Sequence, residues 1–102
     1  MAWVNVAKEG DLQEGEGVMC PVRGHPIGLW KSAGKYFAMD DRCPHKGALL
    51  SEGECKEGKI TCPWHAWQFD LKTGAYVDNP DCQLKIYPVK VQDGNIFIDV
   101  GE

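Results

Sequence analysis

The chain has 102 residues and a net charge of -4, and its lysines and arginines do not gather into a cluster. A chain of this length builds one domain, and the missing basic patch argues against a nucleic-acid partner. No apolar run approaches the roughly eighteen residues of a membrane span. The first residues lack the basic and apolar regions of a signal peptide. We therefore expect a cytoplasmic protein with no nucleic-acid or membrane contact.

Short apolar runs and twelve glycines favour an all-β fold with tight turns. The alternation of apolar and polar residues predicts strands over 3–7, 17–23, 27–31, 35–39, 59–61, 68–71, 84–91 and 95–100. Gly24-His25-Pro26 is predicted to be a turn and Asp78–Asp81 a loop. Asp93-Gly94 lies between the last two runs and indicates a hairpin.

The middle of the chain differs from its two ends. Residues of about 41–81 are rich in glycine and offer few long strands, whereas the segments before and after read as longer strands. We expect a single domain over 1–102, with scaffold strands in about 1–40 and 82–102. The middle region is then an inserted subdomain.

This insert carries two short half-sites, Cys43-Pro-His45 and Cys62-Pro-Trp-His65. Each pairs a thiolate donor with an imidazole donor, which is a mixed ligand set typical of a metal site. The proline after each cysteine favours a tight turn. Mononuclear zinc also takes two cysteines and two histidines. Zinc fingers commonly order them Cys, Cys, His, His, so the interleaved order here favours a two-iron cluster.

The two half-sites resemble the Rieske pattern, in which one loop holds C-x-H and a second holds C-x-x-H. The segments that follow them, Leu49–Gly53 and Phe69–Gly74, are similar to those of small Rieske ferredoxins. Asn79-Pro80 resembles the family's third loop, which covers the cluster. The resemblance extends over essentially the whole chain.

The resemblance implies a Rieske-like antiparallel β-sandwich or partly open barrel with a small cluster-binding subdomain inserted. It also implies one [2Fe-2S] cluster per chain. Carried over, Cys43 and Cys62 would hold an inner iron, and His45 and His65 an outer iron near the surface. Two neutral imidazoles in place of thiolates make such a cluster easier to reduce.

The family's high-potential members carry one further cysteine in each loop, joined as a disulfide. The corresponding positions here are Ala48 and Trp64, and the residues after His65 are Ala66 and Trp67, in place of a Gly-Ser pair that adds a hydrogen bond to the cluster. Fewer hydrogen bonds to the sulfurs lower the potential. We expect a midpoint near the lower end of the Rieske range, about -150 mV.

The histidine count bears on catalysis. Oxygenases of this family need two further histidines for a separate iron, but the chain has three histidines and only His25 remains. The resemblance thus implies an electron carrier and not an enzyme, with a flavin-dependent reductase and a terminal oxygenase as partners. Two alternatives stay open: the small Rieske subunit of an NADH-dependent nitrite reductase, whose partner is the large subunit, and a zinc-stapled interaction module.

Overall fold

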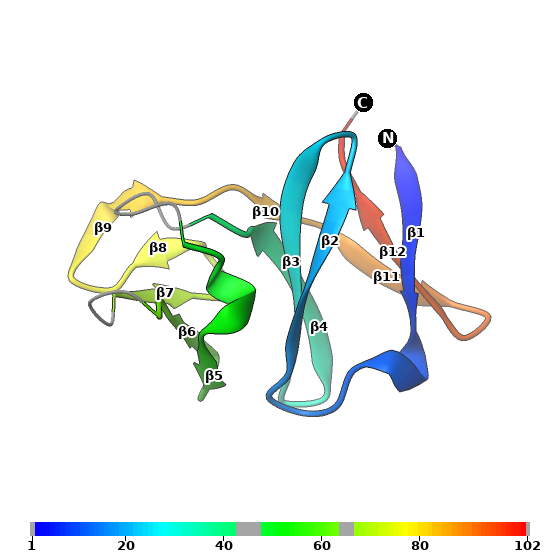
Figure 1. The fold of residues 1–102 in the computed structure, drawn as a ribbon, viewed down its shortest axis with the longest axis horizontal. Coiled ribbons are helices and arrows are strands. Elements are labelled where there is room, and N and C mark those ends of the chain that lie inside the picture. The colour runs from blue at the N-terminus through cyan, green and yellow to red at the C-terminus, as the bar shows by residue number, and fades with distance from the viewer. Residues whose placement is uncertain (1, 43–47, 64–66, 102) are drawn as a thin grey trace.

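The computed structural model describes residues 2–42, 48–63 and 67–101. These residues form antiparallel β-sheets and two short 3₁₀ helices, and they contain no α-helix. The all-β prediction is therefore confirmed, as an open arrangement of sheets and not a closed barrel (Figure 1). No helix in the described ranges is long and apolar enough to cross a membrane.

Within the described ranges, twelve strands and two 3₁₀ helices follow one another. They are β1 (Trp3–Lys8), η1 (Glu9–Asp11), β2 (Gly17–Val22), β3 (His25–Ser32), β4 (Lys35–Asp40), η2 (Leu50–Glu52), β5 (Glu54–Lys56), β6 (Lys59–Thr61), β7 (Gln68–Asp70), β8 (Ala75–Tyr76), β9 (Asn79–Gln83), β10 (Ile86–Tyr87), β11 (Val89–Gln92) and β12 (Asn95–Asp99).

The strands pair into three sheets. One has the order β1-β12-β11, the second β10-β4-β3-β2 and the third β5-β6-β7-β8-β9. We call the first two sheets the scaffold, and the five-stranded sheet with η2 the site-side region. The scaffold brings the first and last strands of the chain together, whereas the site-side region lies to one side of it, with η2 between β3 and β6 (Figure 1).

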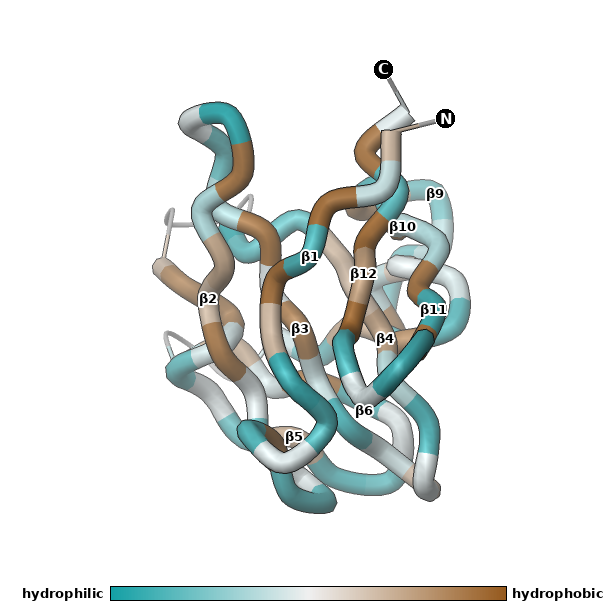
Figure 2. The backbone as a smooth tube through the Cα atoms, turned by 90° about the vertical axis from the view of Figure 1, so that its right-hand side faces the viewer, coloured by the Kyte–Doolittle hydropathy of each residue, from teal (hydrophilic) through white to brown (hydrophobic). Residues whose placement is uncertain are grey.

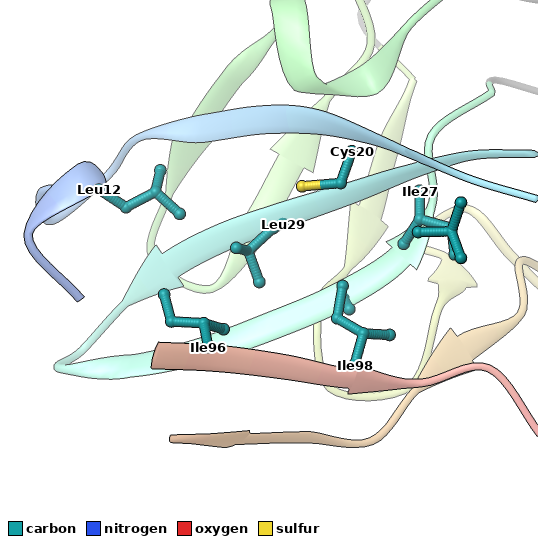
Figure 3. Close-up of a cluster of buried hydrophobic side chains, with 8 residues drawn as sticks. Leu12, Cys20, Ile27, Leu29, Ile96 and Ile98 are labelled. Carbon is teal, nitrogen blue, oxygen red and sulfur yellow. The ribbon is translucent and has the colours of Figure 1, made fainter. Parts of the chain in front are cut away.

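The scaffold sheets enclose an aliphatic core. Strands β2, β3 and β12 are rich in apolar residues (Figure 2). Along β12, buried residues alternate with partly exposed ones, as expected for a strand with one buried face. Leu29 from β3 faces Ile96 and Ile98 from β12 (Figure 3). All three side chains are fully buried. This core therefore holds the two scaffold sheets face to face.

A second core lies under the site-side region and is partly built by the scaffold. Its buried members are Trp30, Met39, Leu50, Ile60, Cys62, Phe69 and Leu71. Trp30 comes from β3 and is fully buried. Its indole occupies the space that side chains at Gly17 and Gly28 would otherwise fill. Scaffold and site-side region therefore share a core at Trp30.

Two turn predictions need correction. β3 begins at His25, so the turn after β2 is Arg23-Gly24, where both residues have positive φ. Pro26 fits within the strand because Pro21 of β2 is its cross-strand partner. The predicted Asp78–Asp81 loop is also wrong, since β9 begins at Asn79. β9 is an edge strand of its sheet, and edge strands accommodate a proline, which has no N–H to donate.

The single strand predicted over 84–91 is two strands that belong to different sheets. β10 pairs with β4, and β11 pairs with β12. Pro88 stands between them, and a proline has no N–H to continue a ladder. Its carbonyl instead accepts a hydrogen bond from the Asp99 N–H at 3.0 Å. Strands β5 and β8 were not predicted, because they have only three and two residues.

Candidate metal centre

Three of the predicted ligands, Cys43, His45 and His65, lie outside the described residues. Cys62 is described, and so are the residues on either side of both ligand-bearing segments. The structure therefore shows how each segment begins and ends.

The chain on both sides of the first ligand segment, 43–47, pairs with itself. Arg42 and Leu49 form an antiparallel β-bridge. One residue further out on each side, the Leu50 N–H donates to the Asp41 carbonyl at 3.3 Å. The residues that enter and leave this segment are therefore neighbours in space.

The second ligand segment, 62–65, has the same construction. Cys62 follows the last residue of β6, and its N–H donates to the Trp67 carbonyl at 2.6 Å. β6 and β7 then continue as an antiparallel pair, with Thr61 opposite Gln68. A short loop at the tip of a hairpin is what two ligands of one pair require.

The turn that follows the first segment lies against the start of the second. Gly53, just after η2, lies directly against the Thr61 carbonyl, and a Cβ built on it would be 3.2 Å from Pro63 Cδ. Leu50 and Cys62 belong to the same buried core. The turn that ends the first segment is thus in contact with the backbone that opens the second.

Cys62 has the surroundings expected of the inner ligand. Its side chain is only 1% exposed and lies among apolar residues. A buried thiolate without a cation is costly, whereas a metal ligand must be deprotonated. The described surroundings and the mixed sulfur and nitrogen donor set fit an iron–sulfur cluster.

Aromatic rings line the chain after the second segment. Trp67 and Tyr76 stack with ring centroids 4.2 Å apart and planes 6° apart, and Phe69 lies within 6.5 Å of the Trp67 centroid. The Trp67 ring packs against the core that holds Cys62. Tyr76 was not singled out, because it reaches this wall only through the pairing of β8 with β7.

Asp41 was missed as well. It is fully buried, and its carboxylate accepts hydrogen bonds from the backbone N–H and the hydroxyl of Ser51. Burial raises the pKa of Asp41, and the Ser51 hydrogen bonds partly offset that effect. An acid two positions before the first ligand was the only available signal.

A hollow of the described surface lies on the scaffold. It measures about 400 Å³ and is lined in part by His25, Lys85 and Tyr87. The Tyr87 hydroxyl donates to Asp40 at 2.7 Å, and burial, followed by this bond, raises the pKa of Tyr87. His25 is exposed.

The two segments that carry the predicted ligands are each joined at their described ends, and Cys62 is buried. The comparison with family models gives the class: residues 2–88 match the Rieske [2Fe-2S] domain. The chain belongs to the Rieske [2Fe-2S] family, and one [2Fe-2S] cluster is its cofactor.

Relatives are similar over almost the whole chain. The ferredoxin component of a p-cumate 2,3-dioxygenase system of Pseudomonas putida is 37% identical, covering 96% of this chain and 86% of the relative. The ferredoxin subunit of a 3-phenylpropionate/cinnamic acid dioxygenase of Photorhabdus laumondii is 45% identical over 74% of each chain.

Solved structures agree. The Sphingomonas yanoikuyae B1 ferredoxin superposes with a TM-score of 0.86 at 31% identity, covering 96% of this chain and 98% of that one. The complex of reduced oxygenase and oxidized ferredoxin in carbazole 1,9a-dioxygenase gives 0.86 at 28% identity, with 94% and 91% coverage. The predicted Rieske fold is confirmed.

Proposed function

We propose that this protein is a one-electron carrier that takes an electron from a flavin-dependent reductase and delivers it to a terminal oxygenase. The relatives named above are ferredoxin components of dioxygenase systems. One solved neighbour is a ferredoxin bound to its oxygenase. The carrier performs no substrate chemistry of its own. The observation that supports the proposal is the pair of ligand-bearing segments whose described ends are joined, with Cys62 buried at the start of the second.

We also propose the ligands. Cys43 and Cys62 would bind one iron through sulfur, and His45 and His65 the other through nitrogen. When bound, the cluster supplies a site that gains and loses one electron. Cys62 contributes a thiolate shielded from water, since its side chain is buried. The Trp67 and Tyr76 stack excludes water from the core beside it. In keeping with the sequence-based division, residues of about 41–81 would act as the cluster-binding subdomain.

Purification without oxygen tests this function. We expect a red-brown protein with two irons and two sulfides per chain, and a one-electron EPR signal after reduction. The protein should restore turnover when mixed with a reductase and an oxygenase from one of the related dioxygenase systems. A colourless zinc-containing protein would contradict the proposal, and so would stable copurification with a large sirohaem subunit.

The cytoplasm is the compartment we propose. Cys20 and Cys55 are thiols whose pKa is raised by burial, which keeps them protonated and unreactive. Thiols of this kind persist where glutathione keeps proteins reduced. Fractionation of the native cells, followed by thiol counting, tests this compartment. Recovery from an oxidising compartment would contradict it.

A low potential belongs to the same proposal. The Ala48 side chain, at one of the positions where high-potential relatives carry cysteine, packs as a half-buried apolar group against the core of Cys62. It offers no hydrogen bond to a cluster sulfur. Potentiometric titration should give a midpoint near -150 mV, and a value above roughly +200 mV would contradict this expectation.

A further inference from the structure

Asp41 is a carboxylate with no exposed surface, which is rare for an acid. Both of its oxygens have a partner on one residue. Oδ1 accepts the backbone N–H of Ser51 at 2.6 Å, and Oδ2 accepts the Ser51 hydroxyl at 2.5 Å. Hydrogen bonds to a carboxylate are among the stronger ones in proteins. A buried acid whose two oxygens both accept from Ser51 indicates a specific connection between two points of the chain.

The backbone of Asp41 is held as firmly as its side chain. Its N–H donates to the Pro26 carbonyl of β3 at 3.0 Å, and its carbonyl accepts the Leu50 N–H at 3.3 Å. Asp41 thus connects the scaffold to η2. Its hydrogen bonds to Ser51 join the chain before segment 43–47 to the chain after it.

η2 in turn reaches the second ligand segment. The Gly53 N–H donates to the Leu50 carbonyl at 2.9 Å and ends η2. Gly53 then lies against the Thr61 carbonyl, directly before Cys62. Contacts that fix the position of η2 therefore also affect the position of the backbone before the second pair of predicted ligands.

We propose that Asp41 is a positioning residue for the metal centre. Through Ser51 its carboxylate holds the two ends of segment 43–47 at a set separation and holds η2 against the second ligand segment. We call this pair of hydrogen bonds the Asp41–Ser51 clasp. The inference rests on the proposed ligands, because it concerns how Cys43 and His45 are presented.

The clasp acts by reducing the freedom of the ligands before they bind. Bringing the two ends of a chain segment together costs conformational entropy. When the ends are already joined, less entropy is lost as the ligands bind. Groups behind the ligands that hold their orientation commonly change metal affinity by about ten- to a hundredfold. Loss of the clasp should therefore accelerate loss of the cluster.

The test compares four single variants of the full-length holoprotein. Asp41→Ala removes both hydrogen bonds of the clasp, and Ser51→Ala removes the one that the hydroxyl donates. Asp41→Asn is the conservative exchange, since its amide oxygen can accept the Ser51 N–H and its amide nitrogen can donate to the Ser51 hydroxyl. Tyr87→Phe is the matched control. It removes a half-buried hydrogen bond of 2.7 Å from the Tyr87 hydroxyl to Asp40, the residue before Asp41. That bond does not involve η2.

Two measurements separate positioning from general stability. The first is the rate at which the visible absorbance disappears in an iron chelator, and the second is the width of the EPR lines of the reduced protein. We expect Ser51→Ala and Asp41→Ala to lose the cluster at least about tenfold faster than the wild type, with broadened lines. Asp41→Asn and Tyr87→Phe should stay within about twofold of the wild type, with unchanged lines.

Three results would overturn the inference. These are a Ser51→Ala variant that matches the wild type in both measurements, a Tyr87→Phe variant that loses the cluster as fast as Ser51→Ala does, and an Asp41→Asn variant that behaves like Asp41→Ala. Should Asp41→Ala fail to fold, the other variants still decide. A wild-type protein without any iron–sulfur cluster would instead refute the proposed function, so the two failures are distinguishable.

Discussion

The scaffold and the site-side region are built from the same kind of element but hold together differently. The scaffold strands β2, β3 and β4 have six to eight residues, and the strands of the site-side sheet have two to five. The scaffold encloses an aliphatic core of its own. The site-side core borrows Trp30 and Met39 from the scaffold.

This difference indicates which region can stand alone. Short strands bury little apolar surface, and burial is the main favourable term in folding. The site-side region therefore depends on the scaffold below it and on the metal cluster it binds. The scaffold should depend on neither. The predictions below test this asymmetry, from the largest expected effect to the smallest.

Cys62→Ser should have the largest effect. It replaces a buried sulfur ligand with a hydroxyl, and we expect complete loss of the cluster. Amide hydrogen exchange should then become fast in β5–β9 and stay slow in β3, β4 and β12. The reason is that the free energy of cluster binding stabilises the region that holds the cluster. Cys20→Ser is the matched control and should keep the visible spectrum. Equal loss of protection in both regions would contradict the asymmetry.

Trp30→Ala should come next, because it removes the side chain on which both regions meet. Trp30 is 0% exposed, and its indole N–H has no hydrogen-bond partner among the described residues, so the loss is one of packing. Truncation of a buried tryptophan costs about 3–5 kcal/mol. Chemical denaturation should show that loss together with a reduced cluster content. Trp3→Ala, on the partly exposed β1, should cost clearly less.

Gly53→Ala should be smaller and confined to the site side. The added methyl group would collide with the Thr61 carbonyl, which belongs to the backbone and cannot turn away. Overpacking of this kind costs about 1–3 kcal/mol. Cluster occupancy, measured as iron per chain, should fall. Gly10→Ala has open space around it and should leave occupancy unchanged.

Ile98→Val should affect the scaffold alone. Ile98 is fully buried in the aliphatic core, and loss of one methylene there costs about 0.5–1.5 kcal/mol. Thermal unfolding should begin at a lower temperature, while the absorption and EPR spectra of the folded protein stay those of the wild type. A changed spectrum would show that the two regions are more tightly coupled than their separate cores indicate.

The smallest effect concerns pH. Hydrogen bonds from the Ala2 and Gly101 N–H groups lower the pKa of the partly exposed Asp99. A lowered pKa contributes stability that is present above about pH 4, the value of the unfolded chain, and is lost as pH falls through the folded value. Asp99→Asn should flatten this part of the acid unfolding curve without changing the curve near neutral pH. An unchanged acid limb would contradict the assignment.

Much of the chain could be predicted because its signals are local. The hairpin at Asp93-Gly94 rests on adjacent residues, and so do the two half-sites that carry Cys43, His45, Cys62 and His65. The order of those four residues favoured a two-iron cluster, and the family comparison confirms that cofactor. Turn chemistry and ligand type depend on neighbours in the sequence, so the amino-acid sequence by itself determined the class of protein.

Only the tertiary structure decided how the two regions meet. The break at Pro88 divides one predicted strand between two sheets. Trp30 belongs to a scaffold strand but packs in the core of the site-side region, which the sequence of that strand does not indicate. Asp41 and Ser51 are ten positions apart and acquire a role only when η2 folds back on β3. Each of these depends on pairing between distant segments, because burial and hydrogen bonding are properties of the folded surroundings and not of the residue alone.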